Sequence, residues 1–184
     1  MNSKLVVFLL IVGVFVPSLL LKAGSYSLLP GDLITISVWG EENLQAETRV
    51  LPDGSISFPL AGRVRVKGKT TTQVERAISS RLKKFIPEAK VSVIVASPDG
   101  HRVYVMGKVA TPGAVVMPSS TMTVTQALSM AGGLDRFAKE NKIKILRKTG
   151  EGQIQGFVRY KDIRSGKDLS TNYQLLPGDT IVVP

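Results

Sequence analysis

The chain has 184 residues and a formal net charge of +10, with one histidine and no cysteine. A chain without cysteine forms no disulfides and no thiolate metal site, and its length permits one ordinary domain or two small ones. The positive charge suits an anionic polymer, a lipid surface or an acidic protein face, and it suits a solubilising surface equally well.

The first predicted element is an apolar leader. Residues 5–21 form a run of 17 apolar or small residues between Lys4 and Lys22, interrupted by Pro17. Such a run is slightly short for a membrane span, so we predict a secretory signal cleaved after Ser25, with an uncleaved membrane anchor as the alternative. Either interpretation delivers the rest of the chain across a membrane, and the net charge becomes +8 if Lys4 and Lys22 leave with the signal.

The strongest pattern is a segment that occurs twice. Residues 26–36 and 173–183 share a Tyr, the run Leu-Leu-Pro-Gly-Asp and a following β-branched stretch. Proline presets φ at the first central position of a turn, and glycine at the second accepts the positive φ of a type II turn. Both copies are therefore predicted to form a tight turn that leads into a strand.

Residues 26–97 are predicted to form a small unit of short strands and one helix. Strands are expected at residues 33–39, 63–67 and 91–95. The Pro-Asp-Gly turn at residues 52–54 predicts a hairpin formed by the segments on either side of it, because Asp-Gly supplies the backbone angles of such turns.

The helix of this unit is predicted from a capping box. Thr72 and Glu75 have the spacing at which each side chain bonds the other residue's backbone N–H. Pro87 ends the helical pattern. The apolar residues at helical spacing are Val74, Ala77, Ile78 and Leu82.

Residues 98–184 are predicted to form a second unit of similar order. A capping box at Thr123 and Gln126 opens a helix that ends at the Gly-Gly pair 132–133. A lone helix on a small mixed sheet is typical of a β-grasp-like unit, so the chain is expected to be α+β, with two small domains after a leader at residues 1–25. The expected strands of the second unit are residues 103–106, 114–118, 143–147, 156–160 and 180–183.

Motifs of catalysis are scarce in the sequence. His101 follows an Asp-Gly turn, which is typical of a solvent-exposed loop histidine rather than a general base. No nucleophile elbow or His-Glu-x-x-His pair occurs, and the spacing of the glycines at residues 150–156 fits a hairpin better than a dinucleotide loop. We therefore predict no enzyme, no cofactor and no metal. Four aspartates adjoin glycines and are assigned to turns: Asp32, Asp53, Asp99 and Asp179.

Basic residues are the better candidates for contact with a ligand. Alternation places Arg63, Arg65 and Lys67 on one face of a strand, and Lys142 and Lys144 belong to a cluster after the second helix. A plain solvated face is the alternative interpretation of both groups. Aromatic residues are not interleaved with them, which argues against nucleic acid as a partner.

In this order, the motifs resemble the bacterial polysaccharide export proteins of capsule and exopolysaccharide secretion. Residues 26–70 and the following helix resemble the export domain of that family, and residues 103–184 resemble one soluble-ligand-binding β-grasp (SLBB) domain. The positions that carry the resemblance include Tyr26, Pro30, Gly31, Asp32, Asp53, Gly54, Gly107, Pro112, Gly113, Pro177, Gly178 and Asp179.

The resemblance implies a non-enzymatic transport component whose copies form a ring around a passage for polysaccharide. It implies an inner-membrane polysaccharide co-polymerase as a partner. Because no cysteine for lipidation and no amphipathic helix after Pro184 are present, it also implies a short member that depends on a separate outer-membrane pore protein. Such a member is expected in the periplasm, associated with the outer membrane through partners, or anchored in the inner membrane by its N-terminus.

Two alternatives to this function stay open at the level of sequence. One is a monomeric module that binds an anionic glycan or another soluble ligand. The other is a glycan hydrolase, which would use a pair of carboxylates whose separation the sequence does not give.

Overall fold

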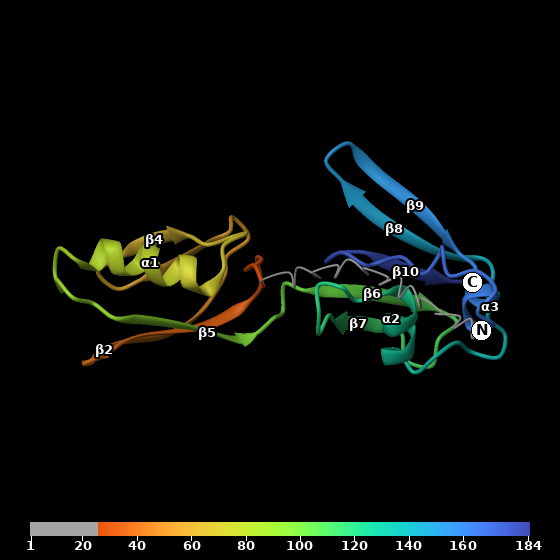
Figure 1. The fold of residues 1–184 in the computed structure, drawn as a ribbon, viewed down its shortest axis with the longest axis horizontal. Coiled ribbons are helices and arrows are strands. Elements are labelled where there is room, and N and C mark those ends of the chain that lie inside the picture. Colours follow the sequence, from red (N-terminus) through yellow and green to blue (C-terminus); the bar gives the residue numbers. More distant parts are fainter. Residues whose placement is uncertain (1–25) are drawn as a thin grey trace, which may run out of the picture.

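The computed structural model describes residues 26–184, so the predicted leader lies outside the described residues. We call residues 26–97 the N-terminal part and residues 98–184 the C-terminal part. Figure 1 shows the ribbon of both parts. Each part encloses its own cluster of buried apolar side chains. Both combine short strands with helices, which confirms the predicted α+β class. Within the described range, no helix is long and apolar enough to cross a membrane.

The N-terminal part contains an antiparallel sheet with the strand order β2-β1-β5. β1 spans Leu33–Val38, β2 spans Glu41–Arg49 and β5 spans Val91–Ser97. A separate antiparallel hairpin consists of β3 (Ser55–Phe58) and β4 (Gly62–Arg65). The two sheets and one helix enclose the first core.

The helix of this part, α1 (Thr71–Leu82), packs against β5. The expected helical spacing is confirmed, because Val74, Ile78 and Leu82 are fully buried on one side of it. Burying each such side chain contributes about 1.5–3 kcal/mol relative to leaving it in water. The buried strand side chains of the same core include Ile34, Ile36, Val38, Ile56, Val64 and Val93.

The hairpin predicted around residues 52–54 is wrong, although its turn is present. The Gly54 N–H donates to the Leu51 carbonyl over 2.8 Å, and the Leu51 N–H donates to the Ser55 carbonyl over 2.9 Å. The flanking strands β2 and β3 nevertheless belong to different sheets, and β3 pairs with β4. Leu44 alone of the β2 residues is buried. This strand therefore has no alternating apolar pattern by which the sequence could predict it.

Helix α1 also begins earlier than the predicted box at Thr72 and Glu75. Thr70 is the N-cap: its N–H donates to Gln73 Oε1 over 3.0 Å, and the Gln73 N–H donates to Thr70 Oγ1 over 3.3 Å. The Glu75 carboxylate instead accepts a hydrogen bond from the Val93 N–H of β5 over 3.0 Å. Residues 70–72 are all threonine and offer the same capping chemistry, so this contact with the sheet helps to decide which of them caps.

The C-terminal part is built on a mixed sheet with the strand order β7-β6-β10-β8-β9. β10 pairs in parallel with β6 and antiparallel with β8, so the last strand of the chain lies in the middle of the sheet. The five strands are β6 (Arg102–Gly107), β7 (Gly113–Val116), β8 (Ile143–Thr149), β9 (Gly152–Val158) and β10 (Thr180–Val183).

One face of this sheet packs against α2 (Val124–Met130), as a β-grasp arrangement requires. The Thr123 N–H donates to Gln126 Oε1 over 2.8 Å, in agreement with the predicted capping box. The strand predicted at residues 156–160 begins and ends earlier than expected, at Gly152 and Val158, because α3 (Tyr160–Arg164) follows it directly. The core under α2 includes Val103, Val105, Leu128, Ile143, Ile145 and Ile181.

Candidate functional site

Each repeated segment folds into the predicted turn, and its aspartate closes that turn. The Leu29 N–H donates to Asp32 Oδ2 over 2.8 Å in the first copy, and the Leu176 N–H donates to Asp179 Oδ2 over 2.8 Å in the second. The glycines before these aspartates have φ of 99° and 91°. A type II turn requires a positive φ at this position, so the prediction of a tight turn before a strand is confirmed in both copies.

Asp32 also receives hydrogen bonds from outside its own turn. Its side chain is fully buried, and Oδ2 accepts from the Tyr26 hydroxyl while Oδ1 accepts from the Gly100 N–H, each over 2.8 Å. Burial, and then the bond to Asp32, raises the pKa of Tyr26 far above its ordinary value. Since Gly100 belongs to the C-terminal part, Asp32 ties the two parts together.

Asp179 has a different partner. From β8, Arg147 donates through Nε to Asp179 Oδ1 over 2.9 Å and through Nη2 to Oδ2 over 2.7 Å. A bidentate pair of this kind compensates for the burial of the carboxylate, and the hydrogen bond to Asp179 raises the pKa of Arg147. Arg147 is thus a structural cation that fastens β10 to β8.

His101 is not the solvent-exposed histidine that its sequence context indicated. Its side chain is 13% exposed, and Nε2 lies 3.0 Å from the Ser27 carbonyl oxygen and 3.8 Å from Asp32 Oδ2. The rings of His101 and Tyr26 have centroids 4.5 Å apart. The segment that covers His101 is distant in the sequence, so no local pattern could predict this burial.

A second set of charges crosses the junction nearer the surface. Asp99 accepts hydrogen bonds from Arg49 of β2 over 3.0 Å and from Ser97 Oγ over 2.9 Å, and it also pairs with Arg102 of β6. These hydrogen bonds, with that from Arg49 the largest cause, lower the pKa of Asp99 to about 2. Arg49 also donates to the Gly31 carbonyl over 2.6 Å, which connects this network to the first turn.

Both turns line one cavity of about 310 Å³ between the two parts of the molecule. Pro30 belongs to the first turn and Pro177 to the second, and Lys67, Arg102 and Tyr104 also line the wall. We call this space the junction cavity. Arg102 is already paired with an aspartate, so Lys67 supplies the unpaired positive charge among these wall residues.

The five basic candidates lie in both parts, and the structure does not gather them at one point. Arg63 and Arg65 are exposed on β4, and Lys67 lines the junction cavity. Lys142 precedes β8 and Lys144 is exposed on β8. Their contact with a polymer stays a prediction.

The face of the five-stranded sheet opposite α2 carries exposed apolar and basic side chains. Tyr104, Met106 and Phe157 have exposed fractions of 49%, 52% and 52%. Lys144 is opposite Phe157 in the β8–β9 pairing, and its Nζ lies 5.8 Å from the centre of that ring. We call this surface the open face, and its residues are Tyr104, Met106, Lys144, Leu146, Gln155, Phe157, Thr180 and Val182.

Sequence reasoning missed the two aromatic residues of the open face. Tyr104 alternates with the buried Val103 and Val105, and Phe157 precedes the buried Val158. Period-two alternation was the available signal, because neighbouring residues of a strand point to opposite faces.

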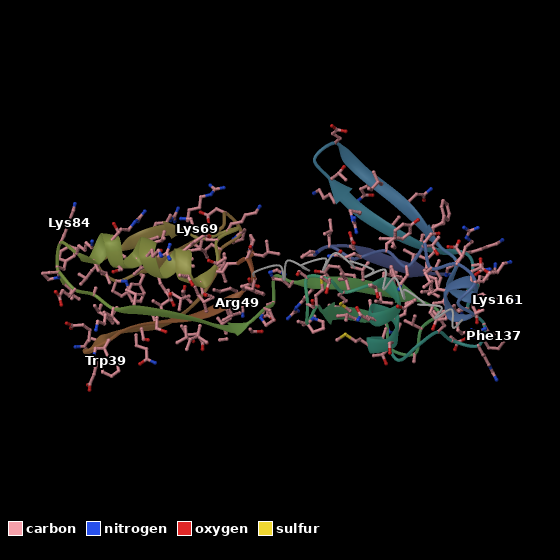
Figure 2. All side chains as sticks on the ribbon, in the orientation of Figure 1. Trp39, Arg49, Lys69, Lys84, Phe137 and Lys161 are labelled. Carbon is pink, nitrogen blue, oxygen red and sulfur yellow. The ribbon has the colours of Figure 1, made fainter. Side chains whose placement is uncertain are left out.

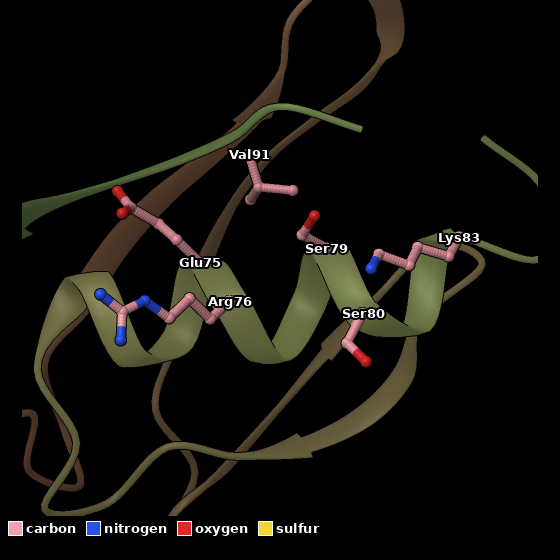
Figure 3. Close-up of a pocket in the computed structure, with 6 residues that line it drawn as sticks. All are labelled: Glu75, Arg76, Ser79, Ser80, Lys83 and Val91. Carbon is pink, nitrogen blue, oxygen red and sulfur yellow. The ribbon is translucent and has the colours of Figure 1, made fainter. Parts of the chain in front are cut away.

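A further cavity, of about 400 Å³, lies beside α1 (Figure 3). Its carboxylate, Glu75, already accepts a hydrogen bond from β5, and Ser79 Oγ donates to the Ala89 carbonyl over 2.8 Å. Among residues 26–184, no group of three His, Cys, Asp or Glu side chains could hold a metal ion. We therefore place the candidate site at the junction cavity and the open face.

The two parts correspond to two known domain families. Residues 22–96 match the family described as Polysaccharide biosynthesis/export protein, and residues 101–183 match the SLBB domain. Together the two matches cover most of the chain. They define the class of protein as a polysaccharide biosynthesis/export protein that carries an SLBB domain.

Curated relatives agree with this class. The chain is 31% identical over 153 residues to the EPS I polysaccharide export outer membrane protein EpsA of Ralstonia nicotianae, covering 70% of this chain and 40% of the relative. It is 30% identical over 161 residues to the polysialic acid transport protein KpsD of Escherichia coli, covering 86% of this chain and 28% of the relative. The exopolysaccharide production protein ExoF of Rhizobium meliloti is 32% identical over 115 residues, which cover 56% of this chain and 25% of the relative.

This chain belongs to the polysaccharide export protein family, with one export domain followed by one SLBB domain. The matched region spans well under half the length of the relatives named above.

Replacing Asp32 by alanine is expected to destabilise the protein by about 2–5 kcal/mol, because the Tyr26 hydroxyl and the N–H groups of Leu29 and Gly100 all lose the buried carboxylate that accepts their hydrogen bonds. Asp135→Ala is the matched control. Asp135 is exposed and closes an exposed turn by accepting from the Phe137 N–H over 2.8 Å, and its loss should cost about 1 kcal/mol or less. Urea unfolding measures both values, and equal losses would contradict the role given to Asp32.

The pairing of Asp99 predicts a pH-dependent stability. Its folded pKa of about 2 lies below the ordinary value of 3.8, so folding favours the ionised form. The stabilisation is therefore present above about pH 4 and is lost as the pH falls through about pH 2. Thermal unfolding should show Asp99→Asn melting below the wild type at about pH 6, with the difference vanishing near pH 2.

Arg49→Gln removes the largest cause of the lowered Asp99 pKa and should abolish part of the same pH dependence. A constant difference in melting temperature between wild type and Asp99→Asn across this pH range would count against the assignment.

Proposed function

We propose that this protein is a component of a capsule or exopolysaccharide secretion system and takes part in moving the polymer out of the cell. The main observation that supports this proposal is the pair of domains, an export domain followed by an SLBB domain, which are joined through the hydrogen bonds of Asp32 and Asp99. We further propose residues 26–97 and 98–184 as the limits of the two domains, with residues 1–25 as the export leader.

We propose that copies of the chain assemble into a ring around the polymer. The charge distribution of the export domain supports this: β2 carries Glu41, Glu42 and Glu47, whereas Arg63 and Arg65 are exposed on β4. Figure 1 places β2 and β4 on opposite sides of that domain. Opposite charges on two surfaces suit a head-to-tail contact, in which one surface of a copy meets the other surface of the next.

We place this ring in the periplasm, associated with the outer membrane through partners. An inner-membrane polysaccharide co-polymerase would deliver the polymer, and a separate outer-membrane pore protein would receive it. The apolar stretch at residues 5–21 and the relative EpsA, an outer membrane protein by its name, support this location.

A second candidate is a monomeric module that binds an anionic glycan or another soluble ligand. The observation in its favour is that a single copy carries both the junction cavity and the open face. Binding there would not require a passage formed by several chains.

Deletion of the gene in its host is expected to lower surface polysaccharide about tenfold or more, because the polymer would lose its route out of the cell. A plasmid copy should restore it. The measurement is a carbohydrate assay of the cell-surface and periplasmic fractions. If the deletion left the amount of every surface polymer unchanged, the proposed export function would be contradicted.

The mass of the full-length protein extracted from its host separates the ring from the monomeric module. Analytical ultracentrifugation should show complexes of several chains if the head-to-tail contact forms. A strictly monomeric species at high concentration, with partner proteins present, would favour the module instead.

A further inference from the structure

On the open face, strand β6 exposes apolar side chains, whereas the side chains on the opposite face of the same strand are buried. Val103 and Val105 of β6 are buried beneath α2, whereas Tyr104 and Met106 between and after them are about half exposed. Isolated exposed apolar residues are common on soluble proteins, but a group of them on one surface marks a binding site. Phe157 extends this group to β9.

The side chains of the open face are arranged in rows across the strands. Neighbouring strands lie about 4.8 Å apart, so a row that crosses from β6 through β10 and β8 to β9 is about 14 Å long. That length suits an extended polymer with more than one sugar ring in contact. One row consists of Met106, Val182, Lys144 and Phe157, which are opposite one another in the strand pairings.

Charge indicates which polymers this surface attracts. Lys144 and Lys148 are exposed on β8, and the five strands of the sheet contain no Asp or Glu. The other two cations of these strands, Arg102 and Arg147, are neutralised by aspartates. Lys67 adds a further positive charge where the open face meets the junction cavity. A negatively charged ligand is therefore attracted.

An aromatic ring beside a cation suits an acidic sugar. The apolar face of a sugar ring packs on an aromatic ring, while a carboxylate on that sugar is attracted to an ammonium group. Phe157 and Lys144 form such a pair at one end of the surface. Tyr104 and Lys67 both line the junction cavity at the other end, and Gln155 on β9 offers an amide to sugar hydroxyls.

We propose that the open face and the junction cavity bind acidic sugar units of a polysaccharide. Tyr104 and Phe157 stack on sugar rings, and Lys67 and Lys144 attract their carboxylates. This site presupposes the proposed export function and deepens it, because it names the class of polymer and the surface that contacts it. The Phe157–Lys144 pair at one end, with Tyr104 and Lys67 lining the cavity at the other, favours a chain of charged units over a single small sugar.

The test compares two probes, the acidic polymer polygalacturonate and the neutral polymer dextran, in affinity electrophoresis with the full-length protein. Polygalacturonate should bind about tenfold more tightly, and its binding should weaken with salt, because salt screens the attraction between carboxylate and ammonium groups. Phe157→Ala and Lys144→Gln should each weaken polygalacturonate binding about threefold to tenfold. Phe157→Ala alone should also weaken the residual binding of dextran.

Arg136 and Phe137 provide a matched control pair. Arg136 lies 4.6 Å from the centre of the Phe137 ring, and Phe137 is 66% exposed. Phe137 lies at the end of the molecule remote from the export domain, outside the open face (Figure 2). Phe137→Ala removes a phenylalanine ring and Arg136→Gln removes a positive charge, as the two open-face variants do. These control variants should leave the affinities for polygalacturonate and dextran unchanged.

Lys144→Glu serves if Phe157→Ala fails to fold, because it reverses an exposed charge and should abolish the preference for polygalacturonate. Any one of three results would overturn the inference. The wild-type protein could bind the two polymers equally, or Phe157→Ala and Lys144→Gln could both bind polygalacturonate as tightly as the wild type does. The control variants Phe137→Ala and Arg136→Gln could also lose as much affinity as the open-face variants. If deletion of the gene abolishes export while the open-face variants bind normally, the export function stands and this site is rejected.

Discussion

The buried carboxylate of Asp32 determines how the two domains of this protein meet. It is fully enclosed, and its donors come from its own turn, from Tyr26 and from Gly100 across the junction. A carboxylate removed from water is tolerated only where other donors replace the water. Each of these donors must therefore be in place, so the first turn, the segment before it and the start of the C-terminal part have to order together. The pairing of Asp99 with Arg49 adds a second, more exposed connection at the same junction.

The repeated Leu-Leu-Pro-Gly-Asp turn stands directly before the central strand of a sheet in both domains. The first copy leads into β1, which lies between β2 and β5, and the second leads into β10, which lies between β6 and β8. Each copy thus begins a central strand, and its aspartate is buried because strands flank it on both sides. The distant hydrogen-bond donor differs between the two aspartates: Asp32 accepts from the Gly100 N–H, whereas Asp179 accepts from the Arg147 side chain. A shared local turn with different distant partners explains why the repeat is so clear in sequence while the two domains differ in topology.

Local chemistry accounts for what the sequence could predict. Proline and glycine define the two turns, and apolar spacing defines α1 and the central strands, because these signals act within a few residues. Pairing over longer distances accounts for the errors. Glu75 bonds to β5 instead of capping α1, and the turn at Asp53 joins strands of different sheets. The candidate site was predictable only in part: Lys67 and Lys144 stood out by charge, but Tyr104 and Phe157 became neighbours of these cations through domain contact and strand pairing.

Residues that form the two turns also line the candidate site. Pro30 and Pro177 preset the backbone of the two turns and also line the junction cavity, where Lys67 of the export domain lies near Tyr104 of the SLBB domain. Neither domain alone contains this cavity, so its shape depends on the orientation that Asp32 and Asp99 hold. The open face then continues the cavity along the sheet whose central strand the second turn begins. The residues that appear most purely structural in the sequence therefore also position the cations and aromatic rings that a polymer would contact.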